Sequence, residues 1–102
     1  MAKDRLDLQD ELEVILGTTN VYYQPPNSTT MVYPCIVYKK EDEQINMASN
    51  EKYQKQNVYT VTVISRTPNS IYSERVGDLK YSRFSRHLVS DNLHHDVYTL
   101  YY

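Results

Sequence analysis

Val58-Tyr59-Thr60-Val61-Thr62-Val63-Ile64, residues 58–64, is the stretch that decides the fold. β-Branched and aromatic residues fill it, and these residue types suit a pleated, half-buried strand. Because neighbouring side chains in a strand point to opposite faces, Tyr59, Val61 and Val63 share one face. Val58 and Ile64 lie on the other face with the two threonines. The stretch predicts the strongest strand of the chain, over about residues 57–65.

Two helices are expected, one before this strand and one after it. The first carries an apolar stripe at helical spacing, formed by Leu8, Leu12, Ile15 and Leu16. Asp4 can cap its start, and Gly17 ends it at the position where a left-handed residue is wanted. The second is short, spans about residues 71–79, and begins at a cap supplied by Asn69 or Ser70.

Three further strands are expected, at about residues 33–40, 81–89 and 94–102. A short strand at 21–23 stays open, because Pro25-Pro26 stops any ladder that begins there. Together the elements predict an α+β fold. Its core is a central, mainly antiparallel sheet of about four strands, with an N-terminal helix and a second short helix. A chain of 102 residues forms one domain, spanning residues 1–102.

The most polar segment of the chain is residues 39–57. Ile45, Met47 and Tyr53 are its only sizeable apolar residues, too few to build a core. A structureless loop of this length is uncommon in a small domain. We therefore expect a polar arm or hairpin at about 39–57, which becomes ordered against a neighbouring molecule.

Tyrosine dominates the aromatic composition, with eleven tyrosines, one phenylalanine and no tryptophan. Tyrosine has an apolar ring and a polar, hydrated hydroxyl, and this combination suits both strands and protein interfaces. One small core cannot bury eleven phenol rings with every hydroxyl bonded, so some tyrosines must be exposed or must meet a partner. With the polar segment, this predicts contacts to other subunits or partners at Tyr22, Tyr23, Gln24, Lys39, Lys40, Glu41, Asp42, Tyr53, Tyr101 and Tyr102.

Several function classes are disfavoured by the composition. A net charge of −2 gives no broad basic surface for nucleic acid. No stretch approaches the roughly 18 to 20 apolar residues of a membrane helix. The N-terminus lacks the apolar core of a signal peptide, so we expect synthesis in the cytoplasm. Two glycines exclude a glycine-rich phosphate loop, and Cys35, the single cysteine, is expected to be a buried structural thiol. We therefore expect no enzyme activity, no catalytic residue and no cofactor.

The histidines invite a metal interpretation, because His94-His95-Asp96 lies close in sequence to His87 and Asp91. Neighbours on a strand point to opposite faces, so His94 and His95 cannot ligate one ion from a regular strand. Polar residues near a turn, hydrogen-bonded at the end of a sheet, are the simpler interpretation. We expect no metal site.

A family resemblance extends this reading. The order of landmarks along the chain resembles that of tail terminator (tail-to-head joining) proteins, small neck and tail-completion proteins of long-tailed bacteriophages. The landmarks are Leu12-Glu13-Val14-Ile15-Leu16-Gly17, Val21-Tyr22-Tyr23-Gln24-Pro25-Pro26, Met31-Val32-Tyr33-Pro34-Cys35-Ile36-Val37-Tyr38, Ala48-Ser49-Asn50 with Tyr53, Tyr59-Thr60-Val61-Thr62-Val63-Ile64-Ser65-Arg66-Thr67-Pro68-Asn69-Ser70, Phe84-Ser85-Arg86-His87 and Asn92-Leu93-His94-His95-Asp96-Val97-Tyr98.

The resemblance implies a small α+β protein of the virion that assembles as a homo-oligomer, a hexameric ring at the head–tail junction. The implied partners are the tail tube protein and the head-completion or neck proteins. DNA would only pass through the lumen of the ring, with no membrane and no catalytic residue involved. Two alternatives stay open: a neck adaptor or stopper protein, and a small module that binds one partner through a sheet edge.

Overall fold

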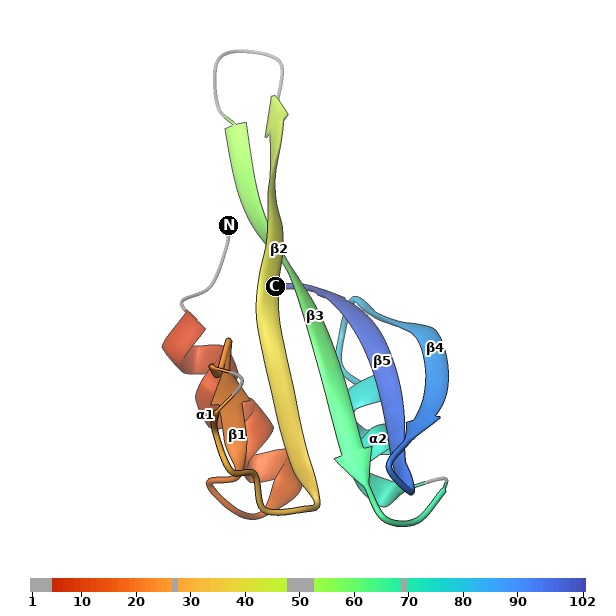
Figure 1. Cartoon of the computed structure of the whole chain (residues 1–102). Coiled ribbons are helices and arrows are strands. Elements are labelled where there is room, and N and C mark those ends of the chain that lie inside the picture. Colours follow the sequence, from red (N-terminus) through yellow and green to blue (C-terminus); the bar gives the residue numbers. More distant parts are fainter. Residues whose placement is uncertain (1–4, 27, 48–52, 69) are drawn as a thin grey trace.

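The described residues form an α+β fold, with one five-stranded sheet and two helices. The computed structural model describes residues 5–26, 28–47, 53–68 and 70–102, and the side chains of all of these except 42–47 and 53–56. The sheet order is β1-β2-β3-β5-β4, and both helices lie behind the sheet in Figure 1, so that one of its faces has no helix on it. The elements are α1 (Arg5–Leu16), β1 (Val21–Tyr23), β2 (Cys35–Met47), β3 (Tyr53–Ser65), α2 (Ile71–Gly77), β4 (Ser82–Ser90) and β5 (Leu93–Tyr101).

The sheet is mixed, and this corrects part of the expectation. Three strand pairs, β2–β3, β3–β5 and β4–β5, are antiparallel, but β1 pairs with β2 in parallel, from Val21 opposite Ile36 to Tyr23 opposite Tyr38. There are therefore five strands where about four were expected. Gln24 adopts a positive φ of 43° and Pro25 follows it, so β1 ends after three residues.

Helix α1 forms as its apolar spacing predicts. Leu8, Leu12 and Leu16 are buried against the sheet, with exposed fractions of 3% or less. Gly17 ends the helix with a φ of 79°, and its N–H donates to the carbonyl of Glu13 at 2.8 Å. The expected cap, Asp4, lies outside the described residues.

Helix α2 is short and begins at one of the two expected caps. The Ser70 hydroxyl accepts from the N–H of Tyr72 at 3.1 Å. At its other end Gly77 packs against Tyr98, where an added Cβ would lie 3.3 Å from the ring. Since that spacing is tighter than an ordinary contact, a glycine there lets α2 approach β5 closely.

The core lies between the sheet and the two helices. Tyr38, Tyr59 and Tyr98 contribute large rings to it, with exposed fractions of 7% or less. The Tyr38 hydroxyl donates to Gln9 Oε1 at 2.5 Å and accepts from Arg5 Nη1 at 3.0 Å, which ties β2 to α1. The Tyr98 hydroxyl lies 2.7 Å from Ser73 Oγ and ties β5 to α2 in the same way. Tyrosines therefore fasten both helices to the sheet.

Strands β2 and β3 continue well beyond the other strands (Figure 1). β1 pairs with β2 only up to Tyr38, and β5 pairs with β3 only from Val58 onward. The outer parts, residues 42–47 of β2 and 53–56 of β3, extend beyond these partners, and the ladder between them runs up to Met47 opposite Tyr53. We call these residues the hairpin arm. Neither described helix is long and apolar enough to span a bilayer.

Removing the Tyr38 hydroxyl should destabilise the fold. In the Tyr38→Phe variant Gln9 and Arg5 each lose a part-buried hydrogen bond, so the free energy of unfolding should fall by about 1–2 kcal/mol. Urea denaturation measures it. Tyr22→Phe is the matched control, since it loses only an exposed bond from the Val32 N–H and should change stability by less than about 0.5 kcal/mol. Equal losses in the two variants would contradict this role of Tyr38.

Candidate interaction surfaces

The ten residues expected to contact other molecules separate into four groups in the structure. Gln24, Lys39, Lys40 and Glu41 come together around one hollow. Tyr22 and Tyr23 lie on β1, Tyr101 and Tyr102 at the end of β5, and Asp42 and Tyr53 in the hairpin arm. The side chains of Asp42 and Tyr53 are outside the described residues, so their backbone pairing alone is known: Asp42 opposite Val58, and Tyr53 opposite Met47.

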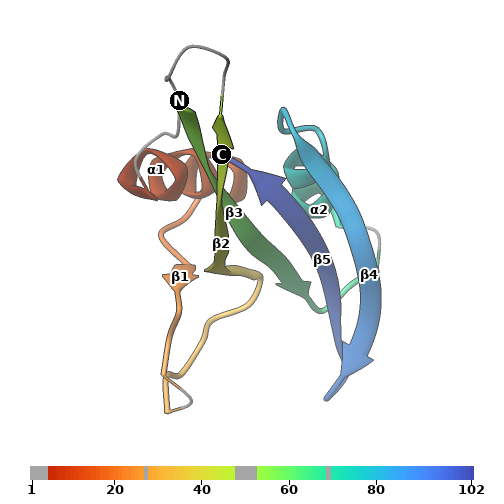
Figure 2. The same ribbon diagram turned by 90° about the horizontal axis from the view of Figure 1, so that it is seen from above.

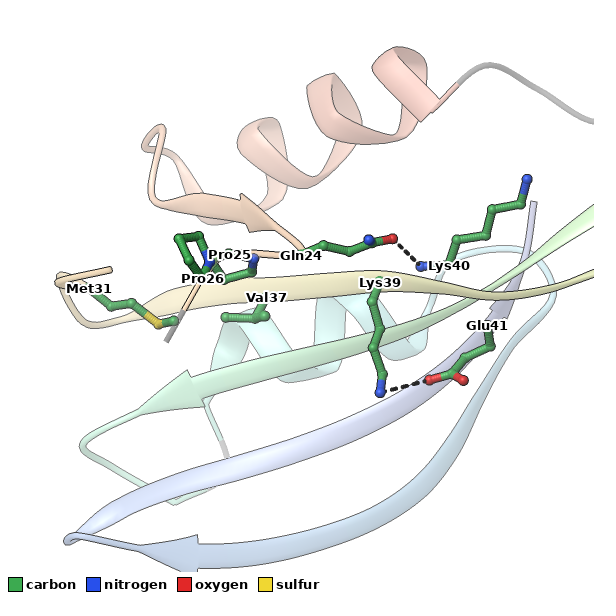
Figure 3. Close-up of a pocket in the computed structure, with 8 residues that line it drawn as sticks. All are labelled: Gln24, Pro25, Pro26, Met31, Val37, Lys39, Lys40 and Glu41. Carbon is green, nitrogen blue, oxygen red and sulfur yellow. Dashed lines mark hydrogen bonds and ion pairs between the residues drawn. The ribbon is translucent and has the colours of Figure 1, made fainter. Parts of the chain in front are cut away.

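The hollow lies between β2 and the segment that follows β1, as Figure 3 shows. Its volume is about 600 Å³ and it is open to solvent. The Gln24 N–H donates to the carbonyl of Tyr38 at 3.0 Å, and its Oε1 accepts from the Lys40 N–H at 3.3 Å, which fixes the segment against β2. The remaining lining residues are Pro25, Pro26, Met31, Val37, Lys39 and Glu41.

The charges at the rim of the hollow largely neutralise one another. Lys39 Nζ lies 3.2 Å from Glu41 Oε1, and the Thr60 hydroxyl donates to the same carboxylate at 2.9 Å. These two contacts, that of Thr60 first, lower the pKa of Glu41 below its ordinary value. An apolar floor of prolines and methionine beside a neutralised ion pair has no strong field for a charged ligand. The hollow is a weak candidate for a site of its own.

The tyrosines of β1 act inside the molecule. The Tyr23 ring lies 4.9 Å from that of Tyr38, and the Arg5 guanidinium stacks 4.4 Å above its centre. The Tyr22 hydroxyl accepts from the Val32 N–H at 3.3 Å, which holds the segment after β1. Both rings are half-buried, so neither is a free anchor for a partner.

Tyr101 and Tyr102 lie at the end of β5, next to the base of the hairpin arm. The Tyr102 N–H donates to the Asn57 carbonyl at 2.9 Å, and its hydroxyl donates to the Glu11 carboxylate of α1. Burial, followed by the bond to Glu11, raises the pKa of the Tyr102 hydroxyl well above its usual range. Tyr101 is half-buried opposite Val58. Tyr102 therefore supports the packing of α1, a role that the sequence analysis did not assign.

Strand β4 is an exposed surface that the sequence analysis missed. It forms one edge of the sheet, and nearly every one of its side chains is exposed. Eight large apolar side chains are exposed among the described residues, and four of them lie on β4 or directly before it. They are Tyr81 at 60%, Phe84 at 59%, Leu88 at 37% and Val89 at 57%. Open, apolar edge strands invite pairing or docking, and proteins usually protect them.

The sequence did contain a signal for this surface. The β4 segment mixes basic and apolar residues without an acidic one, in Arg83-Phe84-Ser85-Arg86-His87-Leu88-Val89. A strand that packs on the core with one face carries apolar residues on that face and polar residues on the other. This strand instead carries apolar residues on both faces. A bulge between Phe84 and Arg86 adds an irregularity to its pairing with β5.

The sheet face without a helix is less suited to docking than β4. Threonines occupy its centre, with Thr62 between Val37 and Val97 in one cross-strand row. These threonines are half-buried, and Val97 is 7% exposed, so little apolar area remains open there.

The histidines are arranged differently from the expectation in one respect. His94 and His95 do point to opposite faces, as their partners Val89 and Leu88 on β4 indicate. His87, however, joins His94 on the helix-side face: their ring centres are 5.5 Å apart, and His87 Nδ1 lies 2.5 Å from Asp96 Oδ1. No group of three potential metal ligands with suitable geometry occurs among the described residues. The absence of a metal stays a prediction.

Comparisons with known proteins return no relative: no family model matches the chain, and neither curated proteins nor solved structures give a match.

The buried thiol should be unreactive. Cys35 has no exposed surface, and burial raises its pKa to about 11. Since the thiolate is the reactive form, the native protein should not react with a disulfide reagent at pH 8, whereas the unfolded protein should give one equivalent. Absorbance of the released thiol measures both. Rapid labelling of the native protein would show that Cys35 is accessible, against its burial here.

Proposed function

We propose that this protein is a structural, non-enzymatic virion component that forms a ring at the head–tail junction of a long-tailed bacteriophage. In this role it caps the tail tube and joins it to the head, with the tail tube protein and head-completion proteins as partners. The resemblance of the sequence landmarks to tail terminator proteins supports the proposal. The structural observation that carries it is the hairpin arm, which extends past the body of a very small domain (Figure 1).

The arm needs contacts from outside its own chain. Its two strands pair only with each other beyond the ends of β1 and β5. An isolated two-stranded hairpin is at best marginally stable in water. The conformational entropy lost in ordering its backbone outweighs the free energy gained from a single ladder of hydrogen bonds. A neighbouring subunit in a ring would supply the missing packing and the second edge. The arm is therefore suited to reach across a subunit boundary.

Ring formation also needs two different patches on each copy. In a head-to-tail assembly, one surface of a subunit meets a different surface of the next, and the ring closes if the rotation allows it. Here β4 forms one edge of the sheet, and β1, with α1 beside it, lies at the other (Figures 1 and 2). A protomer with distinct, opposed sides fits this kind of assembly.

Two other functions remain candidates. An adaptor or stopper of the same neck would use similar surfaces, and the position at which the protein binds, tail tube or portal side, separates it from a terminator. A sheet-edge interaction module is favoured by the exposed apolar residues of β4. Such a module would bind a single partner and would join neither tubes nor heads.

Shortening the arm should abolish assembly and spare the fold. Replacing residues 44–56 by Asn-Gly joins Glu43 to Asn57, which already lie opposite each other, through a two-residue turn. The core half of both strands is untouched, so circular dichroism and thermal unfolding should stay close to those of the unmodified protein. Binding to purified tails that lack this protein, followed by co-sedimentation and electron microscopy, should be lost.

The control for this experiment replaces only residues 48–52 by a glycine–serine stretch of equal length and keeps both strands of the arm. It should bind tails as the unmodified protein does. Normal tail binding by the shortened chain would remove the arm from the assembly. An unmodified protein that binds neither tails nor heads would refute the proposed function itself.

A further inference from the structure

Strand β4 and the two residues before it form a basic segment. Residues 80–90 contain Lys80, Arg83 and Arg86 and no acidic residue, a charge of +3 within eleven positions of a chain whose net charge is −2. All three side chains are exposed. Arg83, Arg86 and Leu88 lie opposite Thr99, Val97 and His95 on β5, so all three share the face of β4 away from the helices, where Leu88 exposes 37% of its surface. This edge therefore combines positive charge with open apolar area.

The α1 side is correspondingly acidic. The helix has four carboxylates, Asp7, Asp10, Glu11 and Glu13, and one cation, Arg5, so that −4 and +1 give −3. Asp7, Asp10, Glu11 and Val14 fall at i, i+3, i+4 and i+7, which places them in one stripe along the helix. This stripe is exposed, and Val14 has the highest exposed fraction of the large apolar side chains described, at 79%. We call it the acidic stripe.

These two surfaces cannot meet within one copy. β4 is the strand at one edge of the sheet, whereas α1 packs beside β1 and β2 at the other, and Figure 2 shows the body of the sheet between them. A surface of +3 on one side and a surface of −3 on the other make the protomer self-complementary only in a head-to-tail arrangement.

We propose that the β4 edge is a docking site for a second copy of this chain, which presents the acidic stripe of its α1. Arg83 and Arg86 would lie against Asp7 and Asp10 of the next copy, and the exposed Val14 would cover Leu88, which lies on the same face of β4 as the two arginines. The inference rests on the proposed ring assembly and names the two surfaces that meet in it. Since the pairs are exposed, each contact is weak and salt-sensitive, and closure of the ring supplies the cooperativity.

The first test is a charge exchange. Arg83→Glu/Arg86→Glu and Asp7→Lys/Asp10→Lys should each weaken self-association at least tenfold, measured by sedimentation at 0.05–1 mM protein and low ionic strength. The four substitutions combined in one chain should restore it, because opposite charges face each other again. Raising the salt to about 0.5 M should weaken association of the unmodified protein, since screening acts over a few ångströms at that concentration.

Matched controls separate the contact from general charge effects. Arg66→Glu changes an exposed arginine outside β4, and Glu74→Lys changes an acidic residue in the first turn of the other helix, α2. Both should associate like the unmodified protein. No association of the unmodified protein, no loss in the double variants, or no recovery on exchange would each overturn the proposal.

Cross-linking identifies the occupant of the β4 edge. Cys35 is buried, so added cysteines are the reactive ones. Mixing Val14→Cys chains with Ser85→Cys chains should give a mixed disulfide at least tenfold faster than Val32→Cys gives with Ser85→Cys; Val32 is an exposed valine outside the acidic stripe. Preferential cross-linking of Ser85→Cys to Gln44→Cys would instead place a strand of the hairpin arm on β4 and overturn the proposal. If the charge-exchange and cross-linking results are as expected but the protein never binds tails, the contact between β4 and α1 stands and only the proposed function is refuted.

Discussion

One continuous ladder between β2 and β3 supports the rest of the molecule. It runs from Cys35 opposite Ile64 to Met47 opposite Tyr53, with a single register shift between Lys40 and Asp42. Its inner half contributes buried residues to the core beneath the helices and pairs with β1 and β5 on either side. Its outer half is the hairpin arm. Because both halves belong to the same two strands, the position of the arm follows from the packing of the core, without a hinge segment between them.

The tyrosines serve this architecture in a way that their number alone does not reveal. Three of them bury their rings in the core and two of these direct their hydroxyls to the helices, Tyr38 to α1 and Tyr98 to α2. Tyr102 adds a third such link through Glu11. A hydroxyl at the end of a rigid ring reaches across the layer between sheet and helix and bonds there, which a phenylalanine cannot do. Much of the tyrosine content is thus explained by packing, and the largest group of exposed apolar side chains among the described residues lies elsewhere, on β4 or directly before it.

The sequence predicted what depends on local pattern and missed what depends on sheet order. Helix α1 and the central part of β3 follow from the spacing of neighbouring apolar residues. β1 depends on a parallel partner that begins twelve residues after it ends, which no local pattern specifies. The exposure of β4 follows from β5 inserting between it and β3, an order that a hairpin sequence leaves undetermined. Four of the ten expected contact residues come together at the hollow, whereas Tyr23 and Tyr102 are half-buried and contact other residues of their own chain. In sequence, aromatic residues of strands look alike whether they face a core or a partner.

The continuity of β2 and β3 has a mechanical consequence. A load applied to the arm along its length passes directly into the two central strands of the sheet. The hydrogen bonds that join those strands to β1 and β5 lie across the direction of such a load, so they resist it side by side and must yield together. A load that peels an edge strand breaks its bonds one after another, at much lower force. The arm is therefore built as a tie anchored at the centre of the domain, where pulling meets the greatest resistance that this small sheet can offer.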